Sequence, residues 1–565
     1  MSPLPALQRF RHSVRHGLWL VAGVSVATNL LLLSLPLYSL QIFDRVLLSR
    51  SIDTLWVLSA GVTLALMASV LLEALRGQVL LRVSNRLALA FERRLFDEIL
   101  GRASRVGDRS QQPLRDLGGL RNFVTAPQGL TALTDAPFAL IFLLLVYWIH
   151  IWLGHAMLAG MVLLLLIAWA TDRLVAPLTR ATGESAQDAQ RRLDGLTLGA
   201  DAVAAHGAGA AAYRYWQAAQ HPALAAASQA GTLAGELASL AKAVRLLLNV
   251  ALTGLGAYLA VRDELTLGSM MAANIVTARA LAPLELLIGA ARQLTVVRVA
   301  VAHLEQVLKT DAAEPAMRLP PMRGAVEFER VIFIPPGSDK PTLKGISCRI
   351  EAGCFVGLIG PSAAGKSTLA RLLTGVWAPR SGVVRIDGAD VQAWNREDFG
   401  RACGYLPQDV QLHNGTVREN ICRFTGAADE AVVAAAQEAD AHEMIVRLAQ
   451  GYDTPVGPAG AALSAGQRQR IGLARALFGA PMLIVLDEPN ANLDVEGEQA
   501  LSRALERAKA RAATLVVISH RPSVLAQADM LGVLHDGELK DWGPRQDVMQ
   551  RLQPPQLVQR KAHVV

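Results

Sequence analysis

The sequence has few cysteines and little charge for its length. Its 565 residues include four cysteines, and 18% of them are charged whereas 52% are hydrophobic. Cys348, Cys354, Cys403 and Cys422 lack metal-ligand spacing, so they predict reduced thiols in a cytoplasmic domain. The basic residues give a net charge of +7 but form no compact cluster interleaved with aromatic residues, so we expect no nucleic-acid binding. The mean hydropathy of +0.30 is high for a soluble protein, and the length predicts more than one domain.

The N-terminal half also lacks a convincing signal-peptide cleavage site. Residues 1–17 are basic, and the apolar run over 18–40 is too long for the apolar region of a signal peptide. Because basic flanks favour the cytoplasmic side, we expect a cytoplasmic segment over 1–17 followed by a first transmembrane helix. At about 20 residues per crossing, six spans are expected. They cover about 18–40, 54–75, two spans within 138–170, 237–261 and 267–288.

Two polar segments between these spans are predicted to extend as helices into the cytoplasm. Residues 76–121 are rich in arginine, which places them inside by comparison with the short loop 41–51. Their apolar residues, including Leu87 and Phe91, recur at helical spacing. Residues 172–236 are polar and alanine-rich and predict the second extension.

Polar residues also fall within or near the later apolar segments. His150 and His155 are expected at the turn between the third and fourth spans, with a metal or proton-relay role as the alternative. Ionisable groups at membrane depth often mark a substrate path, although protruding helices would place them outside lipid. Pro283 is expected to kink the sixth span. The residues open to both interpretations are Arg245, Asn274, Arg279 and Glu285.

A phosphate-binding loop is predicted in the C-terminal half. An apolar run over 355–359 indicates a buried strand, and 369–373 has helical spacing. Glycines let backbone N–H groups turn towards anionic oxygens, and the helix N-terminus adds partial positive charge. Lys366 is placed to reach the β- and γ-phosphates, and the Ser367 hydroxyl to hold Mg²⁺. The loop consists of Gly360, Pro361, Ser362, Ala363, Ala364, Gly365, Lys366, Ser367 and Thr368.

Two further segments complete a predicted hydrolysis site. The apolar strand 483–486 ends in Asp487, placed to hold Mg²⁺, and Glu488, placed to polarise the attacking water. A polar, glycine-containing turn opens another helix and is a second anion site by the same dipole argument. One nucleotide does not need both sites, so a dimer that shares them is the simplest explanation. The residues of this turn are Ser464, Ala465, Gly466 and Gln467.

At this point the chain resembles the ATP-binding cassette exporters over nearly its whole length. Residues 360–368 match Walker A, 463–467 the cassette signature, and 487–488 Walker B with its catalytic carboxylate. Gln408 resembles the Q-loop glutamine, Asp494 the D-loop aspartate and His520 the switch histidine. The resemblance implies catalytic roles for Glu488, His520, Lys366 and Gln408, metal binding by Ser367, Gln408 and Asp487, and the cofactors ATP and Mg²⁺.

A narrower likeness is to the exporters of type I secretion, especially the alkaline-protease subgroup. It rests on residues 35–47, on 134–138 and on 487–494 with Asn490 and Asn492. That subgroup lacks the N-terminal peptidase-like domain of haemolysin exporters, and we expect the same here. The resemblance implies a homodimer in the bacterial inner membrane, with its nucleotide-binding domain in the cytoplasm. It also implies a membrane fusion protein and an outer-membrane channel as partners, and an unfolded secreted protein with a C-terminal signal as cargo.

A lipid or drug exporter on the same scaffold is the main alternative, and it would share every cassette residue. A catalytically silent scaffold is a third interpretation, against which the intact set Lys366, Gln408, Glu488 and His520 argues. The sequence also departs from the family pattern at three positions. Ala465 replaces a usual glycine of the signature, Pro335 occupies the position of the adenine-stacking aromatic, and Pro458 replaces a glutamate that contacts the membrane domain.

The predicted fold is therefore an all-α transmembrane domain of six helices followed by an α/β P-loop nucleotide-binding domain. The predicted divisions are an N-terminal segment, a transmembrane domain, a linker, a nucleotide-binding domain and a disordered tail, over 1–17, 18–310, 311–324, 325–552 and 553–565.

Overall fold

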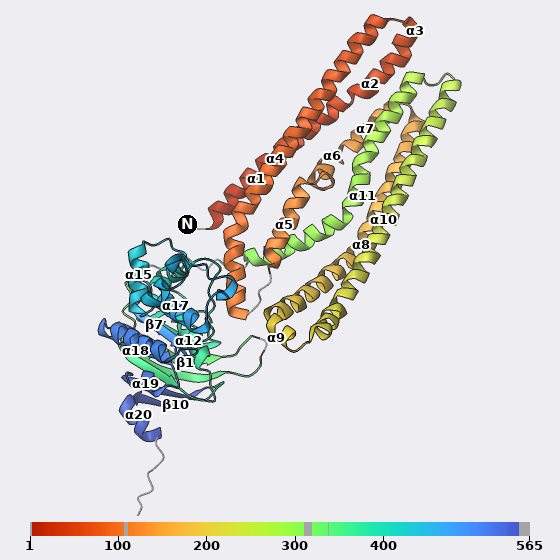
Figure 1. The fold of residues 1–565 in the computed structure, drawn as a ribbon. Coiled ribbons are helices and arrows are strands. Elements are labelled where there is room, and N and C mark those ends of the chain that lie inside the picture. The colour runs from red at the N-terminus through yellow and green to blue at the C-terminus, as the bar shows by residue number, and fades with distance from the viewer. Residues whose placement is uncertain (1–2, 107–110, 310–318, 337, 553–565) are drawn as a thin grey trace, which may run out of the picture. The chain divides into compact units, whose positions relative to one another are not determined.

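The computed structural model describes residues 3–106, 111–309, 319–336 and 338–552 (Figure 1). It forms two compact units, one of Met1–Gly101 and Arg109–Ala312, the other of Arg102–Asp108 and Ala313–Val565. Most of the predicted linker and all of the predicted tail lie outside the described residues.

The described part of the first unit is helical. Its long helices supply the apolar segments, and short π-helical and α-helical pieces join them. The elements are α1 (Pro3–Leu32), α2 (Ser34–Gln41), η1 (Ile42–Val46), α3 (Leu47–Ser49), α4 (Ile52–Val106), α5 (Gln112–Thr125), η2 (Pro127–Thr131), α6 (Ala132–Asp135), α7 (Phe138–Ile149), α8 (Ile151–Leu198), α9 (Ala200–Ala205), α10 (Gly209–Val261) and α11 (Leu267–Lys309).

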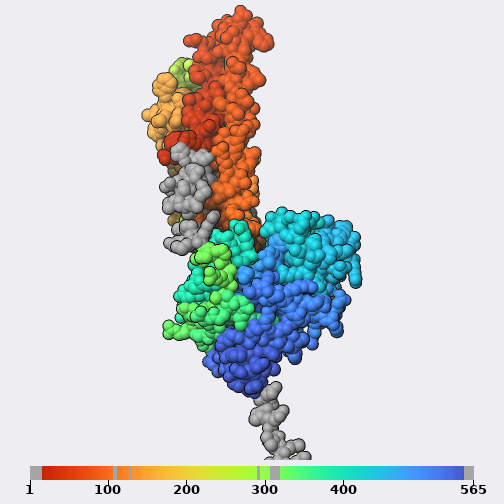
Figure 2. Space-filling view, turned by 90° about the vertical axis from the view of Figure 1, so that its left-hand side faces the viewer, coloured from red at the N-terminus to blue at the C-terminus, as the bar shows by residue number. Residues whose placement is uncertain are grey.

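Six of the described helical segments are long and apolar enough to cross a membrane. They are Arg15–Ser49, Ile52–Arg105, Gly129–Ile149, Ile151–Leu198, Gly209–Val261 and Leu267–Ile288. Only 6% of the apolar window in α4 is buried, and Figure 2 shows the orange surface of this segment along one side of the unit. An apolar helix that is open to its surroundings fits contact with lipid. The predicted number of spans and the helical continuation of the second one are therefore confirmed.

Of the two histidines predicted at the turn between α7 and α8, one lies there. His150 has an extended backbone, and its Nδ1 accepts a hydrogen bond from the N–H of Trp152 (3.3 Å), which caps α8. His155 instead lies within α8, with its ring edge-on to Tyr147 at 5.3 Å. Within the described residues, no group of three or more His, Cys, Asp or Glu residues could hold a metal ion.

Two pairs of polar residues meet across the α10–α11 interface, whereas Arg279 is exposed. Arg245 Nε lies 2.8 Å from Glu285 Oε2, and Asn274 Nδ2 donates to Thr253 Oγ1 (2.9 Å). Pairing of this kind is what polar side chains in an apolar helix bundle require. Pro283 lies inside α11, which Figure 1 shows as a bent helix.

A carboxylate from the first pair of helices caps the N-terminus of α11. The predicted loop 41–51 is helical as far as Ser49, because the apolar helix continues as the π-helical turn η1. Within this turn, Asp44 accepts hydrogen bonds from the Gly268 N–H (3.0 Å) and the Thr266 hydroxyl (2.7 Å). A Cβ atom at Gly268 would lie 2.6 Å from Asp44, so only glycine fits there. Asp44 thus satisfies a free N–H at a positive helix end.

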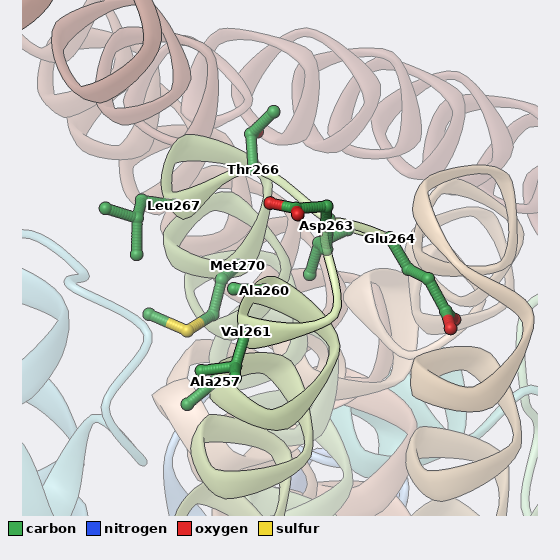
Figure 3. Close-up of a pocket in the computed structure, with 9 residues that line it drawn as sticks. Ala257, Ala260, Val261, Asp263, Glu264, Thr266, Leu267 and Met270 are labelled. Carbon is green, nitrogen blue, oxygen red and sulfur yellow. The ribbon is translucent and has the colours of Figure 1, made fainter.

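This cap lies beside an open cavity at the turn between α10 and α11. Asp263, Glu264 and Met270 are among the residues that line it (Figure 3). Glu264 Oε2 also lies 3.7 Å from His150 Nε2, which ties this turn to the α7–α8 turn.

A second polar cluster joins α1, α4 and α6. The helical path is interrupted after α5. Gly129 there has non-helical angles (φ −96°, ψ −119°), and a Cβ at this residue would lie 1.8 Å from the Phe123 carbonyl oxygen. Asp135, at the end of α6, accepts hydrogen bonds from Arg76 Nη1 (3.0 and 3.1 Å). The same guanidinium nitrogen donates to Ser25 Oγ (3.1 Å), and the side chain of Arg76 is only 9% exposed. The charged pair is therefore held inside the helical unit.

The second unit is an α/β domain with two sheets. Five strands form a parallel array in the order β9-β3-β8-β7-β6, and β10 pairs antiparallel with β9; the other sheet is antiparallel, in the order β2-β1-β4-β5. The central strands are apolar on both faces because helices cover them. The strands are β1 (Val326–Phe333), β2 (Leu343–Ile350), β3 (Phe355–Ile359), β4 (Ser381–Ile386), β5 (Ala389–Asp390), β6 (Cys403–Leu406), β7 (Leu483–Asp487), β8 (Thr514–Ile518), β9 (Met530–His535) and β10 (Glu538–Pro544).

The helices of this unit alternate with the strands, as the sequence pattern predicts. They are α12 (Lys366–Leu373), α13 (Arg396–Ala402), α14 (Val417–Ile421), α15 (Asp429–Glu438), α16 (His442–Val446), η3 (Gly451–Asp453), η4 (Pro458–Gly460), α17 (Ala465–Leu477), α18 (Val495–Ala510), α19 (Pro522–Leu525) and α20 (Arg545–Leu552). The predicted combination of a helical membrane domain and an α/β nucleotide-binding domain is confirmed.

An acid between α15 and α16 holds this helical layer against α18. Asp440 accepts a hydrogen bond from Arg503 Nε (3.1 Å) and lies 3.5 Å from Arg507 Nη2. Burial raises the pKa of Asp440, but the hydrogen bonds and charges of the two arginines outweigh it, so the pKa is lowered overall. The ionised carboxylate therefore stabilises the fold.

Asp440→Asn is expected to destabilise the chain at neutral pH, and the difference should shrink as the medium becomes acidic. The pKa of an aspartate in an unfolded chain is about 3.9. Because the native pKa of Asp440 is depressed, its contribution is complete above that value and disappears as the pH falls through the native pKa. The measurement is the thermal unfolding midpoint of the full chain at pH values from 7 to 3. Asp398→Asn is the control, since its pair with Arg401 is longer (3.7 Å) and largely exposed. A difference that is constant with pH would contradict the assignment.

Candidate nucleotide-binding and hydrolysis site

The phosphate loop joins β3 to α12 with the geometry that its glycines allow. Gly360 has φ +152°, and a Cβ there would lie 2.0 Å from the Leu534 carbonyl oxygen. Gly365 has φ +101° and precedes the first residue of α12. That residue, Lys366, is buried and donates from Nζ to the carbonyl oxygens of Gly360 (2.6 Å) and Pro361 (2.9 Å). The lysine thus closes the loop on itself.

The charges near Lys366 suit an anionic ligand. Burial lowers the pKa of Lys366, whereas the negative charges of Glu488 and Asp487 act in the opposite direction. A partly desolvated ammonium group at a helix N-terminus is stabilised by phosphate oxygens. The loop therefore presents its positive charge where the sequence predicts a nucleotide phosphate.

Asp487 and Ser367 form a donor set that fits a magnesium ion. Asp487 is the last residue of β7 and is 2% exposed, and its Oδ1 makes no hydrogen bond to the described residues. Burial raises the pKa of Asp487, while a hydrogen bond with Ser367 opposes the rise. A buried carboxylate oxygen without a partner, next to a hydroxyl, is the kind of hard oxygen site that Mg²⁺ prefers.

Glu488 lies between two of the other three predicted catalytic side chains, Gln408 and His520. Its Oε2 accepts from Gln408 Nε2 (3.3 Å), and its Oε1 lies 3.8 Å from His520 Nε2. The backbone N–H of Glu488 donates to the Ile518 carbonyl (2.9 Å), which aligns the ends of β7 and β8. The structure thus brings Gln408, Glu488 and His520 together. Gln408 contacts Glu488 here, and its predicted role as a metal ligand stays a prediction.

The signature turn is not part of this cluster. Ser464 caps α17, since its Oγ accepts from the Gln467 N–H (3.2 Å) and Gln467 Oε1 accepts from the Ser464 N–H (2.9 Å). Ala465 and Gly466 form the first turn of that helix, and Asp494 caps α18 by accepting from the Gly497 N–H (2.8 Å). Among the described residues, no hydrogen bond or ion pair joins 464–467 to the loop 360–368.

Two of the departures from the family pattern, Pro335 and Pro458, can be placed in the structure. Pro335 follows β1, and the aromatic residue two positions before it, Phe333, is buried and stacked on Trp377 (4.9 Å, 7°). Phe333 is therefore not free to stack on a base in place of the missing aromatic. Pro458 begins η4, a single 3₁₀ turn before the signature.

Two polar residues near the site were not predicted from the sequence. Ser519 is fully buried next to His520, and Gln469 is 2% exposed on α17. Gln469 Nε2 donates to the Pro489 carbonyl (3.0 Å). Gln469 could have been found from the sequence, because it is a polar residue on the apolar face of an amphipathic helix.

Comparisons with known proteins agree with this geometry. The ABC transporter family model matches residues 343–491, which contain the phosphate loop, the signature and the two acids. The type I secretion system ATP-binding protein PrsD of Rhizobium meliloti (strain 1021) is 36% identical over 95% of this chain and 94% of its own length. The cyclolysin secretion/processing ATP-binding protein CyaB of Bordetella pertussis is 30% identical over 97% of this chain and 77% of its own length.

A solved structure shares the whole architecture. It is a bacterial Atm1-family ABC exporter with ATP bound, with a TM-score of 0.80, 25% identity, and coverage of 96% of each chain. The ATPase-coupled transport that the sequence predicts is thereby confirmed. The chain belongs to the type I secretion system ATP-binding proteins, within the ABC exporters.

Proposed function

We propose that the protein is the inner-membrane ATPase of a type I secretion system and exports an unfolded protein that carries a C-terminal signal. The observation that carries this proposal is a complete hydrolysis cluster in a chain related over nearly its whole length to a type I secretion protein. Relatives named for the export of protein toxins favour a protein cargo over a lipid or a drug.

Within the site, each residue has a role that follows from its position. Lys366 and the N–H groups of the loop 360–368 bind the phosphates of ATP. Ser367 and Asp487 would hold Mg²⁺, which neutralises phosphate charge. Glu488 takes the proton of the attacking water, and Gln408 and His520 orient that carboxylate and the γ-phosphate.

Two copies of the chain would complete each site. Within the part of the chain that the structure describes, the N-terminus of α17 makes no hydrogen bond or ion pair with the phosphate loop, and it is a helix end suited to phosphate. In the proposed homodimer, the turn 464–467 of one copy faces the nucleotide held by the other copy.

The assembly and its location follow from the same proposal. The nucleotide-binding unit lies in the cytoplasm, because the arginine-rich segment 76–121 marks that side. The spans lie in the lipid bilayer of the bacterial inner membrane. A membrane fusion protein and an outer-membrane channel continue the export path outward, and nucleic acid is not a partner.

The test compares culture-medium proteins of the source bacterium carrying the intact chain or the Glu488→Gln chain. One or a few proteins should vanish from the medium and accumulate in the cells of the variant. An unchanged medium, with normal levels of the variant protein in the membrane, would overturn the secretion function. The lipid or small-molecule alternative would then be favoured.

A further inference from the structure

We propose that Asn490 is a positioning residue that holds His520 against Glu488. The inference rests on the proposed function, in which these two side chains act in ATP hydrolysis. Asn490 lies two residues after Glu488, in the segment 487–494. The roles assigned to the site do not use it.

The strands place the two loops side by side. β7 and β8 are parallel neighbours, with Asp487 paired to Ile518. Glu488 therefore leaves one strand next to the point where Ser519 and His520 leave the other. Neither loop is part of the sheet, so the separation of the two catalytic side chains depends on contacts beyond the strand ends.

Asn490 supplies such a contact through Ser519. The fully buried hydroxyl of Ser519 donates to Asn490 Oδ1 (2.9 Å) and accepts from the Arg521 N–H (3.1 Å). The bond from the Arg521 N–H bridges the backbone of His520, and the bond to Asn490 fixes the hydroxyl that accepts it. The orientation of the imidazole thus depends on a hydroxyl whose only acceptor in the described part of the chain is the Asn490 amide.

The side chain of His520 has few contacts of its own. It is 52% exposed, and its Nε2 lies 3.8 Å from Glu488 Oε1. A histidine side chain that is half exposed and has few contacts keeps its position only if its backbone is fixed. The Ser519 bonds provide that fixation.

The turn that carries Asn490 is itself anchored. The Pro489 carbonyl accepts from the buried Gln469 side chain on α17, and the Ala491 N–H donates to the Glu488 carbonyl (3.0 Å). Asn490 therefore connects a fixed turn after β7 to the loop after β8. Removing its amide should let His520 move away from Glu488, and small displacements of catalytic groups reduce turnover strongly.

The test is ATPase kinetics of the purified full chain. Asn490→Ala should lower kcat about tenfold and change the KM for ATP by less than about twofold, because the phosphate loop is untouched. In the His520→Ala background, Asn490→Ala should lower kcat by less than about twofold, since its effect passes through the histidine. Ser519→Ala breaks the same bond from the other side and should behave like Asn490→Ala. If Asn490→Ala does not fold, Ser519→Ala provides the same test.

A matched control removes an amide–hydroxyl bond elsewhere in the same unit. Gln527 Nε2 donates to Ser502 Oγ on α18, and neither residue has an assigned role in the site, so Gln527→Ala should leave kcat unchanged. Normal turnover of Asn490→Ala, or an equal loss in both backgrounds, would overturn the inference while leaving the proposed function intact. Normal turnover of His520→Ala would remove the histidine from the proposed function and this inference with it.

Discussion

Glu488→Gln is expected to bind ATP like the intact chain and to hydrolyse it at least about a hundredfold more slowly, the usual scale for losing a general base. The carboxylate lies between Gln408 and His520, at the end of the strand that also supplies Asp487. An amide keeps the shape of this side chain but cannot accept the proton of the attacking water. The measurement is steady-state ATPase activity together with nucleotide binding by the purified protein.

The control for this variant is an acid-to-amide change outside the site. Glu351→Gln alters an exposed acid of the same unit, which pairs with Arg349 at 2.9 Å, and should leave hydrolysis unchanged. Near-normal turnover of Glu488→Gln would show that another group accepts the proton. A loss of both binding and hydrolysis would instead indicate a disturbed phosphate loop.

Asp135→Ala is expected to destabilise the helical unit by about 3–5 kcal/mol, the range found when one partner of a buried ion pair is removed. Arg76 would remain buried without its counter-charge, with its hydrogen bond to Ser25 as the contact that is left. Arg76 lies roughly 36 Å along α4 from Ile52, given about 1.5 Å of rise per residue, so it is near the end of a membrane crossing. The measurement is the thermal unfolding midpoint and yield of monodisperse protein in detergent.

Two comparisons separate this effect from a general weakness of the unit. The double change Arg76→Met with Asp135→Ala should be milder than Asp135→Ala alone, because no unpaired charge remains buried. Asp172→Ala removes an exposed partner of Arg298 and should cost less than about 1 kcal/mol. If Asp135→Ala is no worse than Asp172→Ala, the pair does not stabilise the unit.

Local sequence patterns predict much of this structure. The lengths of the apolar runs locate the membrane spans. The helical spacing of Leu87 and Phe91 correctly predicts that the helix of the second span continues beyond the membrane, and it ends at Val106. The phosphate loop and the two acids after β7 follow from residues that are adjacent in the sequence. The structure places Lys366 near Asp487 and Glu488 because parallel strands end at one edge of the sheet.

The contacts between distant segments could not be predicted in the same way. Asp44 and Gly268 lie 224 positions apart, and nothing in the local pattern of either residue indicates the other. The non-helical angles at Gly129 accompany a close approach of its backbone to the Phe123 carbonyl, a tertiary contact that helix propensity does not reveal. Likewise Ser519 looks like an ordinary strand-end residue until the fold brings Asn490 to its hydroxyl.

The Asp44 cap also makes one end of the helical unit responsive to the medium. Any movement that separates the first pair of helices from α11 there must return a carboxylate and a positive helix end to water. Their attraction is worth about 0.3–1 kcal/mol at an exposed helix end, and dissolved salt screens it. High ionic strength therefore favours the arrangement in which the first pair of helices is separated from the N-terminus of α11.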